Sequence, residues 1–280
     1  AHGVMVARGD LGVQLATEDI PLAQKRIIGA CNRARRPVIT ATQMLDSMIN
    51  NPNPTRAELT DVANAIFDGT DAVMLSGETA GGKFPVRSCQ TLDRIACAVE
   101  RSAEYRARCM DYFDDVTPGS DLGQAMARAA FIVAKDVEAA AIVTPTLRGN
   151  SPRLLSQLRP SQPIIAVTVS DTTHRQLLLH WGIHPLLSDF VTDSDEMLQN
   201  AMRLSLESGF ARRLDRVVTV AGVPLNSPIP LNMVKVHFLG NILGRGQRGF
   251  GGRASGKMIK AATAAEARKK LTQDGTEILL

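Results

Sequence analysis

Three short apolar segments near the start of the chain are each followed by residues that could bind a phosphate or a metal ion. The first, Val4 to Ala7, leads into Arg8-Gly9-Asp10, a cation, a flexible backbone unit and a carboxylate. A carboxylate oxygen suits Mg²⁺, and a glycine lets the backbone approach a ligand closely. The segments 37–41 and 72–75 lead into Thr42-Gln43 and Ser76-Gly77-Glu78-Thr79 in the same way.

Helical patterns separate these segments, so the order strand, polar end, helix occurs three times. Apolar residues recur at helical spacing over 18–35, 56–68 and 85–108. Thr55 and Glu58 have the spacing of a capping box at the start of the second helix. Parallel strands joined in this way bring their carboxyl ends to one edge, where (β/α) barrels carry out their chemistry. Helix caps and loop residues are the alternative reading, but three polar ends in register favour a shared site.

The overall composition indicates a globular chain with more than one domain. It has 280 residues, of which 44% are hydrophobic, and no apolar run of membrane-spanning length or signal peptide, so we expect a cytoplasmic protein without a membrane partner. The four cysteines have no metal-site spacing. Basic residues gather between Arg245 and Lys270. This segment has one aromatic residue and no recognisable nucleic-acid-binding motif, so nucleic-acid binding is the function we rank last.

A second α/β region is expected after a boundary at 111–120. Helices over 124–135, 152–158, 171–181 and 193–208 alternate with strands over 139–144, 163–168, 183–187 and 216–221. The loop between the first strand and the helix predicted at Pro152 carries hydroxyls, a glycine and arginines. Such a loop could hold a phosphate with its backbone amides, and an ordinary capped loop fits the pattern equally well. Its candidate ligand-binding residues are Thr144, Thr146, Arg148, Gly149, Asn150, Ser151 and Arg153.

The last part of the chain follows a proline-rich connection at 224–230. We expect strands at 234–239 and 257–261, a helix over 263–271 capped by Thr263 and Glu266, and the beginning of a strand at 277–280.

Several of these motifs resemble those of the pyruvate kinase family. The resemblance begins at Met5-Val6-Ala7-Arg8-Gly9-Asp10-Leu11-Gly12 and continues through 41–45, 54–58, 61–65 and 74–80. It implies an α/β fold in which residues 1–110 are the last three units of an incomplete TIM (β/α)8 barrel. Residues 111–223 would be an open α/β effector domain, and 224–280 a linker and a truncated swivelling-type, phosphohistidine-like domain.

The family resemblance also implies roles for individual residues. Asp10 matches the Mg²⁺-binding (or Mn²⁺-binding) carboxylate, and Arg8, Gly9, Asp10 and Thr42 match the substrate site. Thr42, Ser76 and Glu78 match catalytic residues on or behind the proton-transfer path. The loop 144–153 matches the site for a phosphorylated sugar effector, although Arg148-Gly149-Asn150 departs from the usual motif.

The implied activity is phosphoryl transfer from phosphoenolpyruvate to ADP in glycolysis, with Mg²⁺ and K⁺ as cofactors and a homotetramer as the complete assembly. Only about 110 residues precede the second domain, whereas a barrel takes about 250 residues. We therefore expect a fragment that lacks the catalytic Lys and the K⁺ ligands and is inactive alone. The alternative is a non-catalytic phosphosugar-binding or assembly module.

Overall fold

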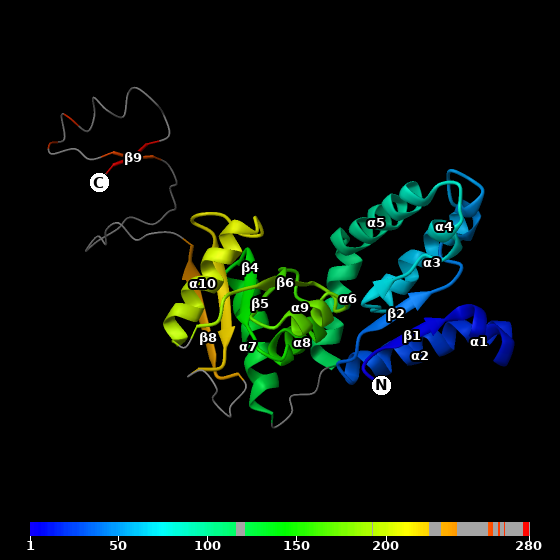
Figure 1. Ribbon diagram of the computed structural model, residues 1–280, viewed down its shortest axis with the longest axis horizontal. Coiled ribbons are helices and arrows are strands. Elements are labelled where there is room, and N and C mark those ends of the chain that lie inside the picture. The colour runs from blue at the N-terminus through cyan, green and yellow to red at the C-terminus, as the bar shows by residue number, and fades with distance from the viewer. Residues whose placement is uncertain are drawn as a thin grey trace.

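The computed structural model describes residues 1–115, 121–191, 193–223, 231–239, 257–259, 263, 266 and 277–279. Two α/β parts lie beside each other, one around a three-stranded sheet and one around a five-stranded sheet (Figure 1). Contacts between side chains of the two parts are described with the candidate site below.

The first part is a run of parallel strands and helices, as the sequence predicts. The sheet order is β1-β2-β3, and the register sets Ala7 beside Ala41 and Thr40 beside Val73. Three β/α units of this kind are compatible with part of a (β/α)8 barrel. The elements are β1 (Val4–Ala7), α1 (Arg8–Gln14), η1 (Thr17–Asp19), α2 (Ile20–Arg33), β2 (Val38–Ala41), η2 (Asp46–Ile49), α3 (Arg56–Phe67), β3 (Ala72–Val73), α4 (Gly77–Ala80) and α5 (Pro85–Arg101).

Two details of this part differ from the sequence prediction. The strand β1 is not buried throughout: Val6 is buried, but Met5 is exposed, because β1 lies at an edge of the described sheet. The strand β3 has two residues instead of four, and only these pair with β2. The capping box of Thr55 and Glu58 is confirmed.

The helix predicted over 85–108 is interrupted at Ser102, where α5 ends and α6 (Ala103–Asp115) begins. Ser102 adopts an extended conformation with ψ of 153°, and its Oγ accepts a hydrogen bond from the Tyr105 amide at 3.1 Å. A serine that accepts a backbone hydrogen bond competes with helix continuation and caps a new helix instead. The part of the predicted boundary that the structure describes, up to Asp115, is therefore helical.

The second part has three layers. Its sheet order is β6-β5-β4-β7-β8, and alternate residues of the strands face two separate cores. One core contains α7 and α8 side chains, and the other contains α10 side chains. The elements are α7 (Leu122–Asp136), β4 (Ala141–Pro145), α8 (Asn150–Gln157), β5 (Ile164–Thr168), α9 (Asp171–Leu177), β6 (Ile183–Leu187), α10 (Ser194–Glu207), β7 (Arg216–Ala221) and β8 (Met233–Phe238).

The strand β8 corrects the expected domain boundary at residue 223. It does not open a new domain, because it pairs antiparallel with β7 along its whole length, from Arg216↔Phe238 to Ala221↔Met233. Leu231, which precedes β8, is fully buried in the core of the second part. The four other strands of the sheet are parallel to one another.

The remaining described residues include β9 (Lys257–Ile259) and β10 (Glu277–Leu279), which pair in parallel. The Glu266 amide donates to Thr263 Oγ1 at 3.3 Å, as in the predicted cap, while most of that predicted helix and most of the basic segment 245–270 lie outside the described residues. None of the helices described is both long and apolar enough to span a membrane.

Candidate functional site

The polar residues that follow β1, β2 and β3 lie at one edge of the three-stranded sheet, as predicted. The parallel register brings the three carboxyl ends together, on the side of the sheet that leads into α1 (Figure 1). Arg8, Gly9 and Asp10 form the first turn of α1.

The Asp10 side chain is free to take a ligand. It is exposed, and in the described part of the chain it has no hydrogen bond or ion pair. A Mg²⁺ ion commonly uses one or two protein carboxylates and keeps water or substrate oxygens in its other positions. Asp10 therefore fits one ligand of such an ion, but the described residues contain no cluster of three or more metal-binding side chains.

Arg8 does not point freely into the candidate site. Its guanidinium donates to the Thr42 carbonyl from Nε at 3.2 Å and from Nη2 at 2.7 Å. It also donates to the Gln43 carbonyl and forms an ion pair with Asp61 of α3. With these partners the Arg8 side chain holds the end of β2, a role that the sequence did not indicate.

The backbone at the end of β2 is strained. Thr42 and Gln43 have φ of 71° and 55°, in the left-handed region that β-branched residues such as threonine rarely adopt. Thr42 Oγ1 is 3.5 Å from the Gly9 amide, so the hydroxyl sits next to the first turn of α1. Strain of this kind persists only where surrounding contacts hold it, and it concentrates at functional sites.

Glu78 lies behind the edge and is only 1% exposed. Its carboxylate accepts from the Leu45 amide at 3.0 Å and from the Ser76 amide at 2.7 Å. The two carboxylate oxygens thus hold the backbone after β2 and β3 in place. A buried side chain in this position is better placed to support the site than to contact a substrate. A Cβ at Gly77 would lie 2.9 Å from Ile49 Cδ1, so a larger residue there would require a shift of the Ile49 side chain.

The loop predicted to bind an effector is closed by its own hydrogen bonds. Thr146 Oγ1 accepts from the Gly149 amide at 2.9 Å, and Gly149, with φ of 78°, precedes the first residue of α8. The helix starts at Asn150, two residues before the predicted start at Pro152. Arg148 and Asn150 are exposed, and Ser151 is buried in the first turn.

Thr144 and Arg153, two of the residues predicted to bind the effector, do not lie on the exposed surface of the loop. Thr144 is fully buried within β4. Arg153 reaches beneath the loop and donates to the Arg148 carbonyl, Gln176 Oε1 and His180 Nε2, each at 3.2 Å. Burial is the main cause that lowers the pKa of His180 to about 4, and the nearby Asp71 carboxylate opposes this shift. The imidazole is therefore neutral near pH 7, and its Nε2 can accept the hydrogen bond from Arg153.

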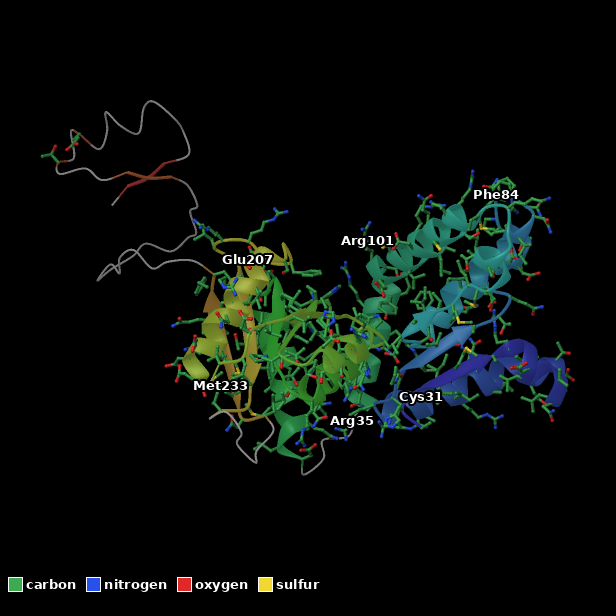
Figure 2. The ribbon with its side chains drawn as sticks, viewed as in Figure 1. Cys31, Arg35, Phe84, Arg101, Glu207 and Met233 are labelled. Carbon is green, nitrogen blue, oxygen red and sulfur yellow. The ribbon has the colours of Figure 1, made fainter. Side chains whose placement is uncertain are left out.

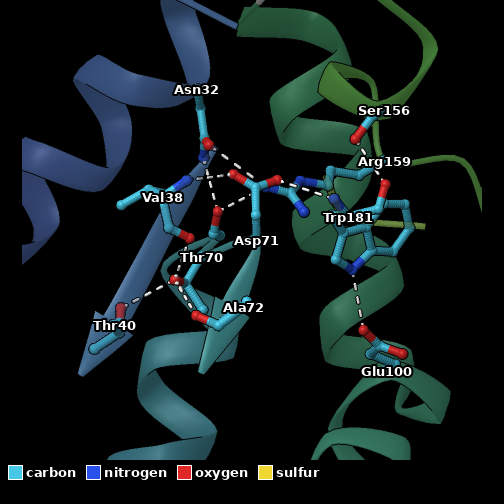
Figure 3. A network of polar contacts seen from close by, with 11 residues as sticks. Asn32, Val38, Thr40, Thr70, Asp71, Ala72, Glu100, Ser156, Arg159 and Trp181 are labelled. Carbon is cyan, nitrogen blue, oxygen red and sulfur yellow. Dashed lines mark hydrogen bonds and ion pairs between the residues drawn. The ribbon is translucent and has the colours of Figure 1, made fainter. Parts of the chain in front are cut away.

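A polar network that no sequence motif indicates joins the two parts of the molecule (Figure 3). Arg159 Nη2 lies 3.1 Å from Asp71 Oδ1, and both side chains are more than nine-tenths buried. The same Asp71 oxygen accepts from the Trp181 amide at 3.2 Å, while Oδ2 accepts from the Val38 amide at 2.9 Å. Trp181 Nε1 donates to Glu100 of α5 at 3.0 Å.

Comparison with known proteins agrees with this architecture. Residues 1–89 match the family model for the pyruvate kinase barrel domain, and residues 124–237 match the one for the pyruvate kinase alpha/beta domain. The chain belongs to the pyruvate kinase family. The second match extends into β8, in agreement with the place of this strand in the five-stranded sheet.

Pyruvate kinases from several organisms are similar to the chain over most of its length. The one from Geobacillus stearothermophilus is 46% identical over 98% of the chain, and the one from Clostridium acetobutylicum is 45% identical over 84%. A crystal structure of a pyruvate kinase from Cryptosporidium parvum superimposes with a TM-score of 0.79 at 40% identity, covering 86% of this chain and 47% of that one. The chain spans 46% of the Geobacillus protein and 50% of the Clostridium protein.

Proposed function

We propose that this chain supplies part of the active site of a pyruvate kinase, which transfers a phosphoryl group from phosphoenolpyruvate to ADP. The observation that carries the proposal is the shared edge of β1, β2 and β3. There a free carboxylate, Asp10, lies on the same edge as a strained, hydroxyl-bearing residue, Thr42. The relatives above are named as enzymes, and no observation favours a separate non-catalytic module.

In this proposal each residue acts by position. Asp10 would hold Mg²⁺ or Mn²⁺, whose charge neutralises phosphoryl oxygens when bound. The Gly9 and Asp10 amides, in the first turn of α1, would face the substrate carboxylate. The Thr42 hydroxyl, beside the Gly9 amide, would lie on the path by which the enolate gains a proton, with Ser76 next along the edge. Phosphoryl transfer depends mainly on such positioning and charge stabilisation.

The test uses two proteins and a coupled assay of pyruvate formation. We expect no activity from the 280-residue chain alone. The same chain joined to the amino-terminal part of the Geobacillus pyruvate kinase should turn over phosphoenolpyruvate and ADP. Asp10→Asn in the joined protein should lower kcat/KM at least about 100-fold, because one hard ligand of the cation is lost. Asp46→Asn, an exposed carboxylate of η2 near the same edge that has no role in the proposal, serves as the control. A joined protein that folds but is inactive would refute the proposal.

The family resemblance extends the proposal to regulation and assembly. The loop from Thr146 to Ser151 would bind a phosphorylated sugar, with Arg148 exposed beside its amides. The complete protein would be a homotetramer that also requires K⁺. Calorimetry with glucose 6-phosphate tests the loop, with Arg148→Ala as the variant and Arg175→Ala, an exposed arginine of α9, as the control. Sedimentation of the joined protein tests the tetramer.

A further inference from the structure

The segment 43–51, which follows the strained Thr42 and contains η2, is held firmly against the first part of the molecule. Three of its apolar side chains are fully buried in one cluster with side chains of α3: Met44, Leu45 and Met48. The Ile49 carbonyl accepts a hydrogen bond from the Lys83 amide at 2.8 Å. Figure 2 shows Phe84, the residue after Lys83, at the end of α5 that lies away from the five-stranded sheet. The contacts that hold this segment therefore come from the first part.

Glu58 of α3 accepts four hydrogen bonds, two from Ser47 and two from Thr55. Its Oε1 accepts from the Ser47 amide at 2.7 Å, and its Oε2 accepts from Ser47 Oγ at 2.6 Å. Oε2 also accepts from the Thr55 amide at 2.7 Å and from Thr55 Oγ1 at 2.9 Å. Burial favours the protonated carboxyl, but the hydrogen bonds outweigh it and lower the pKa of Glu58 below its ordinary value. An ionised carboxylate therefore ties Ser47 to Thr55.

The contacts of Glu58 with Ser47 go beyond what a helix cap requires. In a capping box the glutamate accepts from the backbone of the capping residue, which here is Thr55. Ser47 lies in η2, outside the helix that Glu58 caps. Two residues before it, the Leu45 amide donates to Glu78 of α4 at 3.0 Å. Carboxylates from two helices thus hold two alternate amides of the same segment.

This double hold accounts for the strained conformation of Thr42. A threonine keeps a left-handed φ only where the surrounding structure imposes it. Pairing of β2 with β1 fixes the chain before Thr42, and the two carboxylates fix it from Leu45 onward. The chain must therefore turn within residues 42–44, and this turn leaves Thr42 Oγ1 3.5 Å from the Gly9 amide.

We propose that Glu58 is a positioning residue for proton transfer: by holding Ser47, its carboxylate keeps the Thr42 hydroxyl beside the first turn of α1. The inference rests on the proposed function, in which this hydroxyl lies on the path by which the enolate gains a proton. Without the carboxylate the segment relaxes, and the hydroxyl moves away from the Gly9 amide. Asp10 and Gly9 belong to α1 and stay in place. Loss of Glu58 therefore slows proton transfer and leaves the binding of phosphoenolpyruvate unchanged.

The exchange of pyruvate methyl hydrogens with D₂O measures the proton step by itself. One C–H bond of the methyl group breaks and one C–D bond forms at the same carbon, so the exchange needs neither phosphoryl transfer nor a co-reactant. The experiment uses the joined protein described above, with Mg²⁺ and K⁺, and follows the exchange by NMR. Glu58→Gln should slow it at least about tenfold, while KM for phosphoenolpyruvate stays within about twofold of the wild type. The effect is partial because Arg8 still holds the Thr42 carbonyl.

Three further variants separate positioning from the stability of α3. Thr55→Ala removes the capping hydroxyl but leaves both donors of Ser47, so methyl exchange should stay within about twofold of the wild type. Glu196→Gln makes the same charge change at the third residue of α10 and should have no effect. Ser47→Ala removes one donor to Glu58 without a change in α3 and should slow methyl exchange at least about twofold. This milder variant tests the same contact if Glu58→Gln does not fold.

Amide exchange of the 280-residue chain adds a measurement that needs no activity. Glu58→Gln should speed hydrogen–deuterium exchange at residues 42–47, and Thr55→Ala should not. The inference is overturned if Glu58→Gln exchanges methyl hydrogens at the wild-type rate, or if Thr55→Ala or Glu196→Gln slows that exchange as much. An inactive joined wild type would refute the proposed function and this inference with it. An active wild type with an unaffected Glu58→Gln overturns the inference alone.

Discussion

At the scale of single residues, the end of β2 depends on the Arg8–Asp61 pair. Thr42 and Gln43 adopt positive φ angles, and the Arg8 guanidinium donates hydrogen bonds to both of their carbonyl oxygens. Asp61 fixes that guanidinium from α3. An arginine after a strand suggests contact with a substrate, but in the structure it supports the residue that would make the contact.

The Arg8–Asp61 pair gives the first prediction. Asp61→Asn removes the charge that fixes Arg8, so we expect faster amide exchange at Thr42 and Gln43 and a loss of about 1–2 kcal/mol in the free energy of unfolding. Hydrogen–deuterium exchange and urea denaturation measure the two effects. Asp46→Asn, near the same edge and exposed, is the control. Unchanged exchange at residues 42–43 in the Asp61 variant would show that the strained backbone does not need the pair.

His180 gives a prediction about pH. Burial, the largest cause, lowers its pKa from 6.5 to about 4, so in acid the unfolded chain binds a proton before the folded chain does. The neutral imidazole therefore contributes stability that is fully present above pH 6.5 and is lost as the pH falls toward about 4. Urea denaturation at pH 7.0 and 4.5 should show a smaller loss for His180→Gln, which keeps an acceptor for Arg153. An equal loss in both proteins would assign the acid sensitivity to other groups, such as His184 and His237, whose pKa values burial also lowers.

At the scale of elements, local sequence signals located most of the strands and helices. Runs such as Ile164–Thr168 are apolar and β-branched, and the helices between them have apolar residues at helical spacing. The local signals failed where the decisive contact is distant or is a competing side chain. The break at Ser102 depends on one side-chain hydrogen bond, and the place of β8 depends on pairing with β7 across the connection 224–230.

The pairing of β8 predicts how the second part responds to truncation. A chain that ends at Leu239 keeps β8 and Leu231, whereas one that ends at Val223 loses both and exposes the edge of β7. Unpaired strand edges and lost apolar burial lower stability and promote aggregation. We expect the shorter chain to unfold at least about 5 °C below the longer one, as measured by calorimetry at equal concentration. Equal unfolding temperatures would contradict the assignment of β8 to this sheet.

At the scale of the whole molecule, the candidate active edge and the junction lie at opposite ends of the three-stranded sheet. The strand ends that carry Asp10 and Thr42 point away from the second part, whereas Asp71 precedes β3 and bonds to the first residue of β2 (Figures 1 and 3). The loop 146–151 connects to this junction through Arg153 and His180. Sequence reasoning missed the junction because Asp71 and Arg159 are 88 positions apart and neither belongs to a motif.

The buried Asp71–Arg159 pair predicts that the two parts unfold together. Removal of one charge leaves the other buried without a partner, which costs about 3–5 kcal/mol, so Arg159→Met and Asp71→Asn should each be strongly destabilising. The double variant should lose clearly less than the sum, because neither charge is then left alone. In calorimetry, the single transition of the wild type should separate into two in Arg159→Met.

Arg203→Met serves as the control, because its exposed ion pair with Glu207 should contribute less than about 1 kcal/mol. Additive losses in the double variant would mean that the pair does not couple the two parts. A single transition in Arg159→Met would place the coupling in the remaining contacts, the bonds of Trp181 to Asp71 and Glu100. Because those bonds share the Asp71 carboxylate with Arg159, Asp71→Asn should reduce cooperativity more than Arg159→Met does.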